Sequence, residues 1–241
     1  MRNTLPAVLL VLTITAPAFT QRAQPSEPVI AVQGSAEIRV APDEATVRLG
    51  ILRQANTAQA AQEQANATAQ QILSAITQLG VPQQQIQTSR LNLSPIFAPR
   101  GPESREAPRI VAYQAANLIS IRLDDLSQVG PAIDAGLKAG ANQLEGVQFG
   151  LRNELPAREQ ALKQAVNEAR RKADAIAEAL NVRLDGVLDV SEGGVSVTPR
   201  TEFGDVVMAR SLEAAPTPVS PGQLEVRASV SIRYRIGAVS R

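Results

Sequence analysis

The chain has 241 residues, of which 44% are hydrophobic and 2% aromatic, and its formal net charge is +1. The apolar fraction is large enough to build an aliphatic core, which argues against global disorder. The near-zero charge argues against electrostatic capture of nucleic acid or anionic membranes. Because the chain contains no His and no Cys, Ser-His and Cys-His nucleophile systems are excluded, and a zinc site is disfavoured.

The N-terminus has the pattern of a secretory signal peptide. Met1-Arg2 is a basic start, Leu5 to Thr15 is apolar, and Ala16-Pro17-Ala18 places small residues where signal peptidase reads them. We predict a signal peptide over residues 1–18, cleaved after Ala18 or, alternatively, after Thr20. The apolar run is shorter than the roughly 20 residues that span a bilayer, which disfavours an uncleaved anchor.

Residues 19–28 are polar, contain two prolines and are predicted to be a linker. From Val29 to Val40, apolar residues alternate at period two with Gly34 in the same register, which predicts a half-buried strand. Ala41-Pro42-Asp43 predicts a turn, and the alternation over residues 47–51 predicts a second strand that forms a hairpin with the first.

A long helix is predicted next, capped by Thr57 and stopped by Gly80. Its apolar positions recur every three or four residues, and the first of them are all alanine, which predicts close packing. The following pattern predicts a strand, a Pro-rich loop, a strand, a helix and a strand, in that order, over residues 86–97, 98–108, 111–123, 127–140 and 144–151.

Pro156 opens the most regular helix of the chain, at a position where its missing N–H costs nothing. We predict that its apolar stripe and three i,i+4 ion pairs are formed by the following residues. The stripe is Leu162, Ala165, Ala169, Ala173, Ile176 and Leu180, and the pairs are Glu159–Lys163, Glu168–Lys172 and Arg170–Asp174.

The C-terminal part is predicted to hold a strand over 182–190, an extended or disordered Pro-rich loop over 199–221, and a final strand over 224–236. The final strand has the clearest period-two pattern in the chain. Its Arg227, Arg233 and Arg235 lie on the polar face. They would resist unwanted pairing if this strand were a sheet edge, or would meet acidic groups of a neighbouring subunit.

The predicted order β-β-α-β-β-α-β-α-β-β indicates an α+β fold, with antiparallel or mixed sheets covered on one face by about three helices. We expect one domain over 29–238. Its sub-domains, about 29–125 and 126–238, would share a sheet edge or exchange strands.

The sequence contains no constellation of catalytic, cofactor-binding or metal-binding residues. Asp124-Asp125 is interpreted as charge at a helix start, with a hard-cation site as the alternative. Gly34-Ser35, Gly140-Ala141-Asn142 and Gly193-Gly194 are interpreted as turns and close packing, because none matches a phosphate-binding loop. Arg170-Arg171-Lys172 is interpreted as a solvated helix face, with an oligomer contact as the alternative.

Several segments, in their order along the chain, resemble the SIMPL-domain family of exported bacterial proteins, which includes the 26 kDa periplasmic immunogenic antigens. Ser35-Ala36 departs from the family pattern, which usually has a second glycine shortly after the one at Gly34. The similar segments are Val32-Gln33-Gly34, Pro42-Asp43-Glu44-Ala45, Gly80-Val81, Gln87-Thr88, Tyr113-Gln114-Ala115-Ala116-Asn117, Ala139-Gly140-Ala141-Asn142, Gly146-Val147-Gln148-Phe149 and Ala165 to Ala173.

The resemblance implies an α+β fold, a periplasmic or envelope location, and no established catalytic activity. It also implies an association with oxidative or general stress tolerance. Some members of the family form large ring-like homo-oligomers. The family offers no catalytic residues to carry over to this chain.

The leading hypothesis is a non-enzymatic exported envelope protein that self-assembles and contributes to stress tolerance. The alternative is a periplasmic module that binds a small ligand or peptide, with the Pro-rich loops 98–108 and 199–221 as a lid. A third hypothesis, a hydrolase that uses Asp, Ser or Lys, is disfavoured because His is absent. No cofactor is expected, and the expected partner is a second copy of the chain.

Overall fold

The computed structural model describes residues 27–99, 107–199 and 217–238. The predicted signal peptide and most of the predicted linker lie outside these residues. The helices and strands follow the order predicted from the sequence. They are β1 (Val29–Val40), β2 (Glu44–Ala55), α1 (Ala58–Gln78), β3 (Ile86–Phe97), β4 (Ile110–Leu123), α2 (Val129–Lys138), β5 (Gln143–Gly150), α3 (Leu155–Ala179), β6 (Val182–Pro199) and β7 (Leu224–Ala238).

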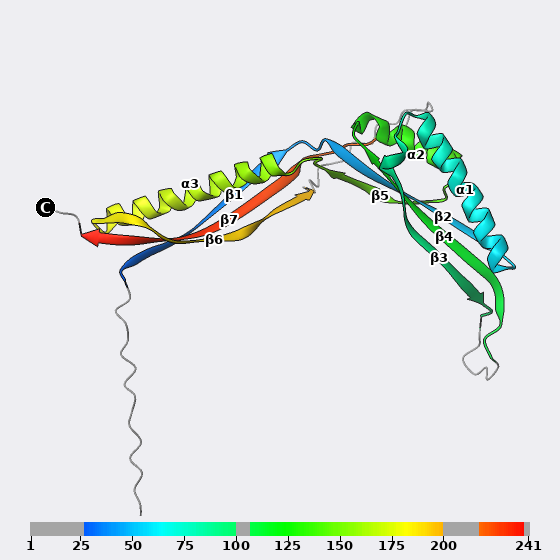
Figure 1. Ribbon diagram of the computed structural model, residues 1–241, viewed down its shortest axis with the longest axis horizontal. Helices are drawn as coiled ribbons and strands as arrows, with labels where there is room; N and C mark the ends of the chain where they lie inside the picture. The colour runs from blue at the N-terminus through cyan, green and yellow to red at the C-terminus, as the bar shows by residue number, and fades with distance from the viewer. Residues whose placement is uncertain (1–26, 100–106, 200–216, 239–241) are drawn as a thin grey trace, which may run out of the picture.

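The strands form two antiparallel sheets, which confirms the α+β prediction. Sheet A has three strands in the order β1-β7-β6, and sheet B has four in the order β3-β4-β2-β5. Figure 1 shows an elongated molecule in which α3 lies along one face of sheet A while α1 and α2 cover one face of sheet B. No helix among the described residues covers the opposite face of either sheet.

The predicted hairpin between the first two strands is wrong. β1 pairs with β7, and β2 pairs with β4 and β5, so residues 41–43 carry the chain from one sheet to the other. The period-two pattern determines which face of a strand is buried but not which strand lies beside it. Each sheet contains strands that precede residue 125 and strands that follow it. The sub-domain boundary near residue 125 stays a prediction.

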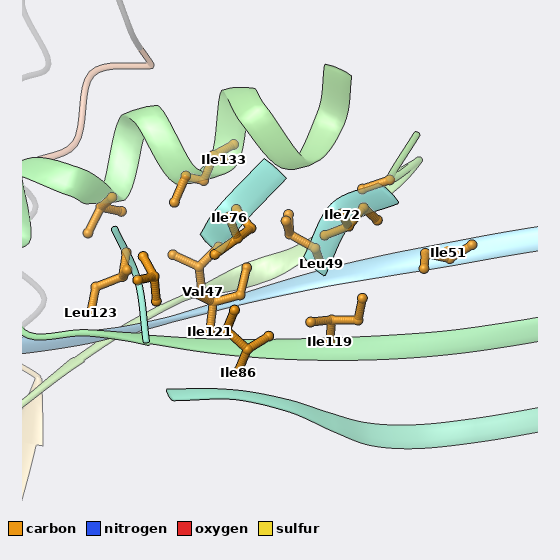
Figure 2. Close-up of a cluster of buried hydrophobic side chains, with 14 of the residues drawn as sticks. Val47, Leu49, Ile51, Ile72, Ile76, Ile86, Ile119, Ile121, Leu123 and Ile133 are labelled. Carbon is orange, nitrogen blue, oxygen red and sulfur yellow. The ribbon is translucent and has the colours of Figure 1, made fainter. Parts of the chain in front are cut away.

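The core of sheet B is aliphatic, as the composition requires. Figure 2 shows Ile72 and Ile76 of α1 and Ile133 of α2 pointing onto side chains of β2 and β4. The N-terminal half of α1 contributes Ala61 and Ala65, both fully buried, so this end of the helix lies close to the sheet. The N-cap is Thr57, whose hydroxyl accepts a hydrogen bond from the N–H of Ala60, as predicted.

The core of sheet A is built on alanines. Helix α3 buries six of them at a spacing of four, from Ala157 to Ala177, against β1, β7 and β6. Gly34 of β1 lies under this helix, and a Cβ there would overlap the carbonyl oxygen of Ala165. The helix backbone therefore rests almost directly on the strand.

The prediction that Ile176 and Leu180 are part of the core stripe is wrong. Their side chains are 40% and 60% exposed. An alanine stripe brings the helix so close to the sheet that larger side chains are displaced to its flank. The three predicted i,i+4 ion pairs are present, with N–O distances of 3.8, 3.0 and 3.2 Å in chain order.

Strand β6 is longer than predicted and extends to Pro199. Gly193-Gly194, interpreted as a turn, lies inside the strand at one of three register shifts, and Gly194 has a φ of +99°. Such a β-bulge lets the strand continue past the glycines. The last strand, β7, is the central strand of sheet A rather than an edge, so its arginines do not protect an edge.

Candidate functional surfaces

A concavity lies on the open face of sheet A, on the side away from α3. It has a volume of about 580 Å³, and its lining comes from neighbouring positions on β1, β7 and β6. Glu37 faces Arg227 and Ser35 faces Ser229 across the β1–β7 pair. The bulge at Gly193-Gly194 forms the third wall.

One arginine and one glutamate carry the charge of this pocket. The Nε of Arg227 lies 3.6 Å from a carboxylate oxygen of Glu37 and in closer contact with Glu225. Arg227 is 65% exposed, whereas the side chain of Glu225 is only 10% exposed. The pocket is therefore polar and close to electrically neutral. It contains serine hydroxyls, but its lining includes no His and no Lys that would activate one as a nucleophile.

Helix α3 covers the free edge of β1 with a Glu–Lys pair. The backbone N–H of Ser35 donates a hydrogen bond to Glu168, and Lys172 Nζ donates to the carbonyl oxygen of Gln33 at 2.9 Å. The Ser35 N–H, aided by the Lys172 ammonium 3.0 Å away, holds the pKa of Glu168 below its usual range. An incoming strand would have to displace both side chains.

The other sheet edges are also modified against pairing. Arg158 of α3 donates to the carbonyl oxygen of Val195 on β6 at 2.9 Å, and β6 is bulged at three places. Strand β3 carries Pro95, which has no N–H to donate. Strand β5 has only eight residues and contains Gly146 with a φ of +141°. Association of this protein by edge-to-edge pairing is therefore disfavoured.

An apolar strip lies on β3 and the start of β4. Leu91 and Leu93 pair in register with the buried Asn117 and Ala115, so they lie on the helix-covered side of sheet B. Helix α1 packs mainly over β4 and β2, which leaves them uncovered. We define the β3 strip as the exposed apolar side chains Leu91 (64% exposed), Leu93 (43%), Phe97 (48%) and Ile110 (45%).

A second apolar strip lies beside α3. Val187 and Val190 of β6 pair in register with the buried Tyr234 and Ile232, so they lie on the helix side of sheet A. Ile176 follows Arg158 by 18 residues, which is five helical turns, and therefore lies on the β6 side of α3. We define the β6 strip as Val187 (55% exposed), Val190 (56%), Ile176 (40%) and Leu180 (60%).

The junction between the sheets is held by two carboxylates. Asp43 accepts a hydrogen bond from the N–H of Arg152 at 2.7 Å, and the Arg152 guanidinium lies 3.6 Å away. Asp134 of α2 accepts from the hydroxyl of Thr217 at 2.7 Å and from its N–H at 3.2 Å. The hydrogen bond from the Thr217 hydroxyl has the larger effect, and together with the bond from the Thr217 N–H it holds the pKa of Asp134 below its usual range.

The acidic pair and the other glycine motif singled out in the sequence have structural roles. Asp125 accepts hydrogen bonds from the hydroxyl and N–H of Ser127, which lower its pKa, and it caps the turn before α2. Asp124 accepts from Gln85 at 2.7 Å. Gly140 ends α2 with a φ of +105°, and the Asn142 amide bonds both the N–H and the carbonyl of Leu52.

The basic residues 170–172 do not form a single surface patch, because two of them interact with different parts of the protein. Arg170 pairs with Asp174, and Lys172 reaches Gln33. Arg235 of β7 pairs with Glu27 at 3.2 Å. Within residues 27–99, 107–199 and 217–238, no group of three or more acidic residues is placed to hold a metal ion. No helix in the same part of the chain is long and apolar enough to cross a membrane.

Sequence reasoning missed the pocket and both strips. The described parts of the Pro-rich loops do not line the pocket, and residues 100–106 and 200–216 lie outside the described structure. The signal for the β3 strip was present, because Leu91, Leu93 and Phe97 alternate at period two. That pattern shows an apolar face, but it cannot show that the covering helix lies over other strands.

Comparison with known proteins places the chain in a family. Residues 30–234 match the model of the SIMPL family, described as a protein of unknown function (DUF541). The chain belongs to the SIMPL family. This SIMPL protein is 31% identical over 241 aligned residues to the 26 kDa periplasmic immunogenic protein of Brucella melitensis, covering 95% of this chain and 94% of the relative.

Two further relatives match over similar lengths. The 26 kDa periplasmic immunogenic protein of Brucella abortus is 30% identical, over 95% of this SIMPL protein and 94% of the relative. The uncharacterized protein YggE of Escherichia coli K12 is 23% identical, over 97% and 91%. None of these names describes an enzyme.

Proposed function

We propose that this SIMPL protein is a non-enzymatic envelope protein of the periplasm that self-associates and contributes to tolerance of oxidative or general stress. The observation that carries self-association is the pair of exposed apolar strips, one beside each helical layer. Exposed large apolar side chains that gather on one surface commonly mark an interaction site. The names of the two Brucella relatives and the predicted signal peptide support the periplasmic location.

The charges around the strips favour contact between unlike surfaces of two copies. The segments that carry the β3 strip, residues 86–97 and 107–123, contain three arginines and no acidic residue. Strand β6 carries one arginine and three acidic residues. A β3 strip against a β6 strip brings opposite charges together, whereas either strip against its own copy brings like charges together. The proposed contact is therefore head-to-tail.

The test uses two complementary double variants. Leu91→Ser with Leu93→Ser disables the β3 strip, and Val187→Ser with Val190→Ser disables the β6 strip. All four side chains are exposed, so the fold should be retained. The matched control is Leu79→Ser with Leu155→Ser, two exposed apolar side chains outside both strips.

Light scattering on a sizing column should give a multiple of the protomer mass for the wild type and the control. Each double variant should be monomeric alone, and the two mixed should form a one-to-one dimer, because each retains the surface that the other has lost. A monomeric wild type at every concentration would overturn self-association. Assembly of both variants, or no dimer on mixing, would overturn the assignment of the strips.

The stress role is tested in cells that lack the gene for this protein. We expect the wild type and the control to restore survival of peroxide, and the two strip variants to fail although they are expressed and exported normally. Full rescue by both strip variants would separate stress tolerance from association.

Binding of a small ligand or peptide is the second candidate function. The 580 Å³ pocket on the open face of sheet A favours it, since ligand pockets commonly have volumes of about 300–1,000 Å³.

A further inference from the structure

The pocket on sheet A is kept open by a glycine. A Cβ at Gly193 would overlap the hydroxyl of Ser229, whereas a Cβ at Gly194 would meet no atom within 4 Å but would be strained by its φ of +99°. The bulge therefore exposes the Ser229 hydroxyl to the pocket. A side chain at position 193 would occupy that space.

The lining contains one positive and one negative side chain, Arg227 and Glu37. Their 3.6 Å separation is longer than a hydrogen bond. Both neighbouring carboxylates approach the Nε of Arg227. The described residues accept no hydrogen bond from its two Nη groups, which are the ends that bind a carboxylate in bidentate fashion. Glu37 lies between two arginines, 3.6 Å from Arg227 and 4.0 Å from Arg39. Both separations are longer than a hydrogen bond, so its oxygens can still accept one from a ligand ammonium.

The remaining lining limits the rest of the ligand. It offers the hydroxyls of Ser35, Ser196 and Ser229, while the side chains of Ala36 and Ala228 pack into the core under α3. It includes no aromatic ring, and its largest apolar residue, Val195, packs against the core under α3. A bulky apolar ligand would therefore gain little, whereas a polar ligand with small substituents can hydrogen-bond to three hydroxyls.

We propose that this pocket binds short zwitterionic peptides with small side chains, with the terminal carboxylate on Arg227 and the terminal ammonium on Glu37. A net-neutral lining with one charge of each sign matches a zwitterion better than an anion or a cation. The site is an open sheet face, so the peptide is held by side chains rather than by pairing with a strand edge. We expect weak binding, with a Kd on the order of 1 mM.

This inference deepens the second candidate function and is independent of self-association, because the pocket shares no residue with either apolar strip. Loss of assembly in the strip variants should leave peptide binding unchanged. Conversely, loss of peptide binding in the pocket variants should leave the solution mass unchanged.

The experiment is saturation-transfer NMR, which detects weak ligands on large assemblies. The probe is L-alanyl-L-alanine, compared with its N-acetyl, its C-terminal amide and its doubly capped forms. With the wild type, the free dipeptide should give a saturation-transfer signal. That signal should be weaker for each singly capped form and absent for the doubly capped form.

Three variants assign the contacts. Arg227→Gln should weaken the free dipeptide at least tenfold while no longer distinguishing it from its amide. Glu37→Gln should also weaken binding of the free dipeptide at least tenfold, and it should no longer distinguish the free dipeptide from its N-acetyl form. Gly193→Val should abolish binding by filling the pocket. Arg233→Gln is the matched control, because it removes an exposed arginine from the same strand outside the lining.

No transfer to the free dipeptide on the wild type would overturn the proposal. So would equal binding of the free and doubly capped forms, or an equal loss with Arg233→Gln. The normal melting temperature of each variant serves as the folding control.

Discussion

The carboxylate of Glu168 on α3 accepts a hydrogen bond from the backbone N–H of Ser35, which lies 133 residues earlier on the free edge of β1. One turn along the helix, Lys172 donates to the carbonyl oxygen of Gln33. This i,i+4 ion pair therefore does more than stabilise its own helix. It satisfies the Ser35 N–H and the Gln33 carbonyl oxygen on the free edge of β1. Helix α3 therefore stabilises sheet A by its charges as well as by its alanines.

Acid should weaken this attachment. The folded state lowers the pKa of Glu168, so the contribution is complete above the ordinary glutamate pKa of about 4.3 and is lost as pH falls through the lower folded-state value. Unfolding midpoints in denaturant, measured from pH 7 downward, should fall less steeply for Glu168→Gln than for the wild type below that pKa. Parallel profiles for the two proteins would contradict the prediction.

Gly34→Ala should strongly destabilise the protein. The added Cβ overlaps the carbonyl oxygen of Ala165, so the backbone of α3 must move away from β1. Overpacking of this kind costs about 1–3 kcal/mol or more in the free energy of unfolding. Gly186→Ala on β6 is the control, because a Cβ there meets no atom within 4 Å. Chemical denaturation of both variants checks the difference, and equal losses would refute the close helix–strand approach.

Asn117→Leu should stabilise the protein. Asn117 is 4% exposed, and within the described structure its Oδ1 accepts no hydrogen bond. Removing a buried unsatisfied polar group recovers about 1–3 kcal/mol. Asn142→Leu should do the reverse, since its amide makes two hydrogen bonds to Leu52. Thermal unfolding should move the two melting temperatures in opposite directions, and a lower value for Asn117→Leu would show that its amide is satisfied.

Asp43→Ala should loosen the junction between the sheets. Its carboxylate accepts a hydrogen bond from the N–H of Arg152 at 2.7 Å, and a bond to a charged group contributes about 1.5–3 kcal/mol. Arg152→Gln removes only the exposed 3.6 Å ion pair and should cost about 0–1 kcal/mol. Hydrogen exchange should rise around residues 150–154 in Asp43→Ala but not in Arg152→Gln. Unchanged exchange in both would show that other contacts hold the junction.

Much of the fold could be predicted from local patterns. The period-two alternation of β1 and β7 and the alanine spacing of α3 identified these elements and their buried faces. The end of β6 was missed because Gly193-Gly194 has the composition of a turn, and only the pairing with β7 shows that the strand continues through a bulge. The pocket that this bulge forms was missed for the same reason.

The sequence by itself determined the order of the elements, the aliphatic core and the family, because each depends on local spacing, composition or ordered motifs. The tertiary structure decided that β1 pairs with β7 rather than with β2, and that β3 and β6 extend beyond the helices that cover their sheets. Alternation marks a face of a strand as apolar, but its neighbour and its cover come from segments distant in the chain. The exposed strips and the polar pocket are consequences of those long-range choices.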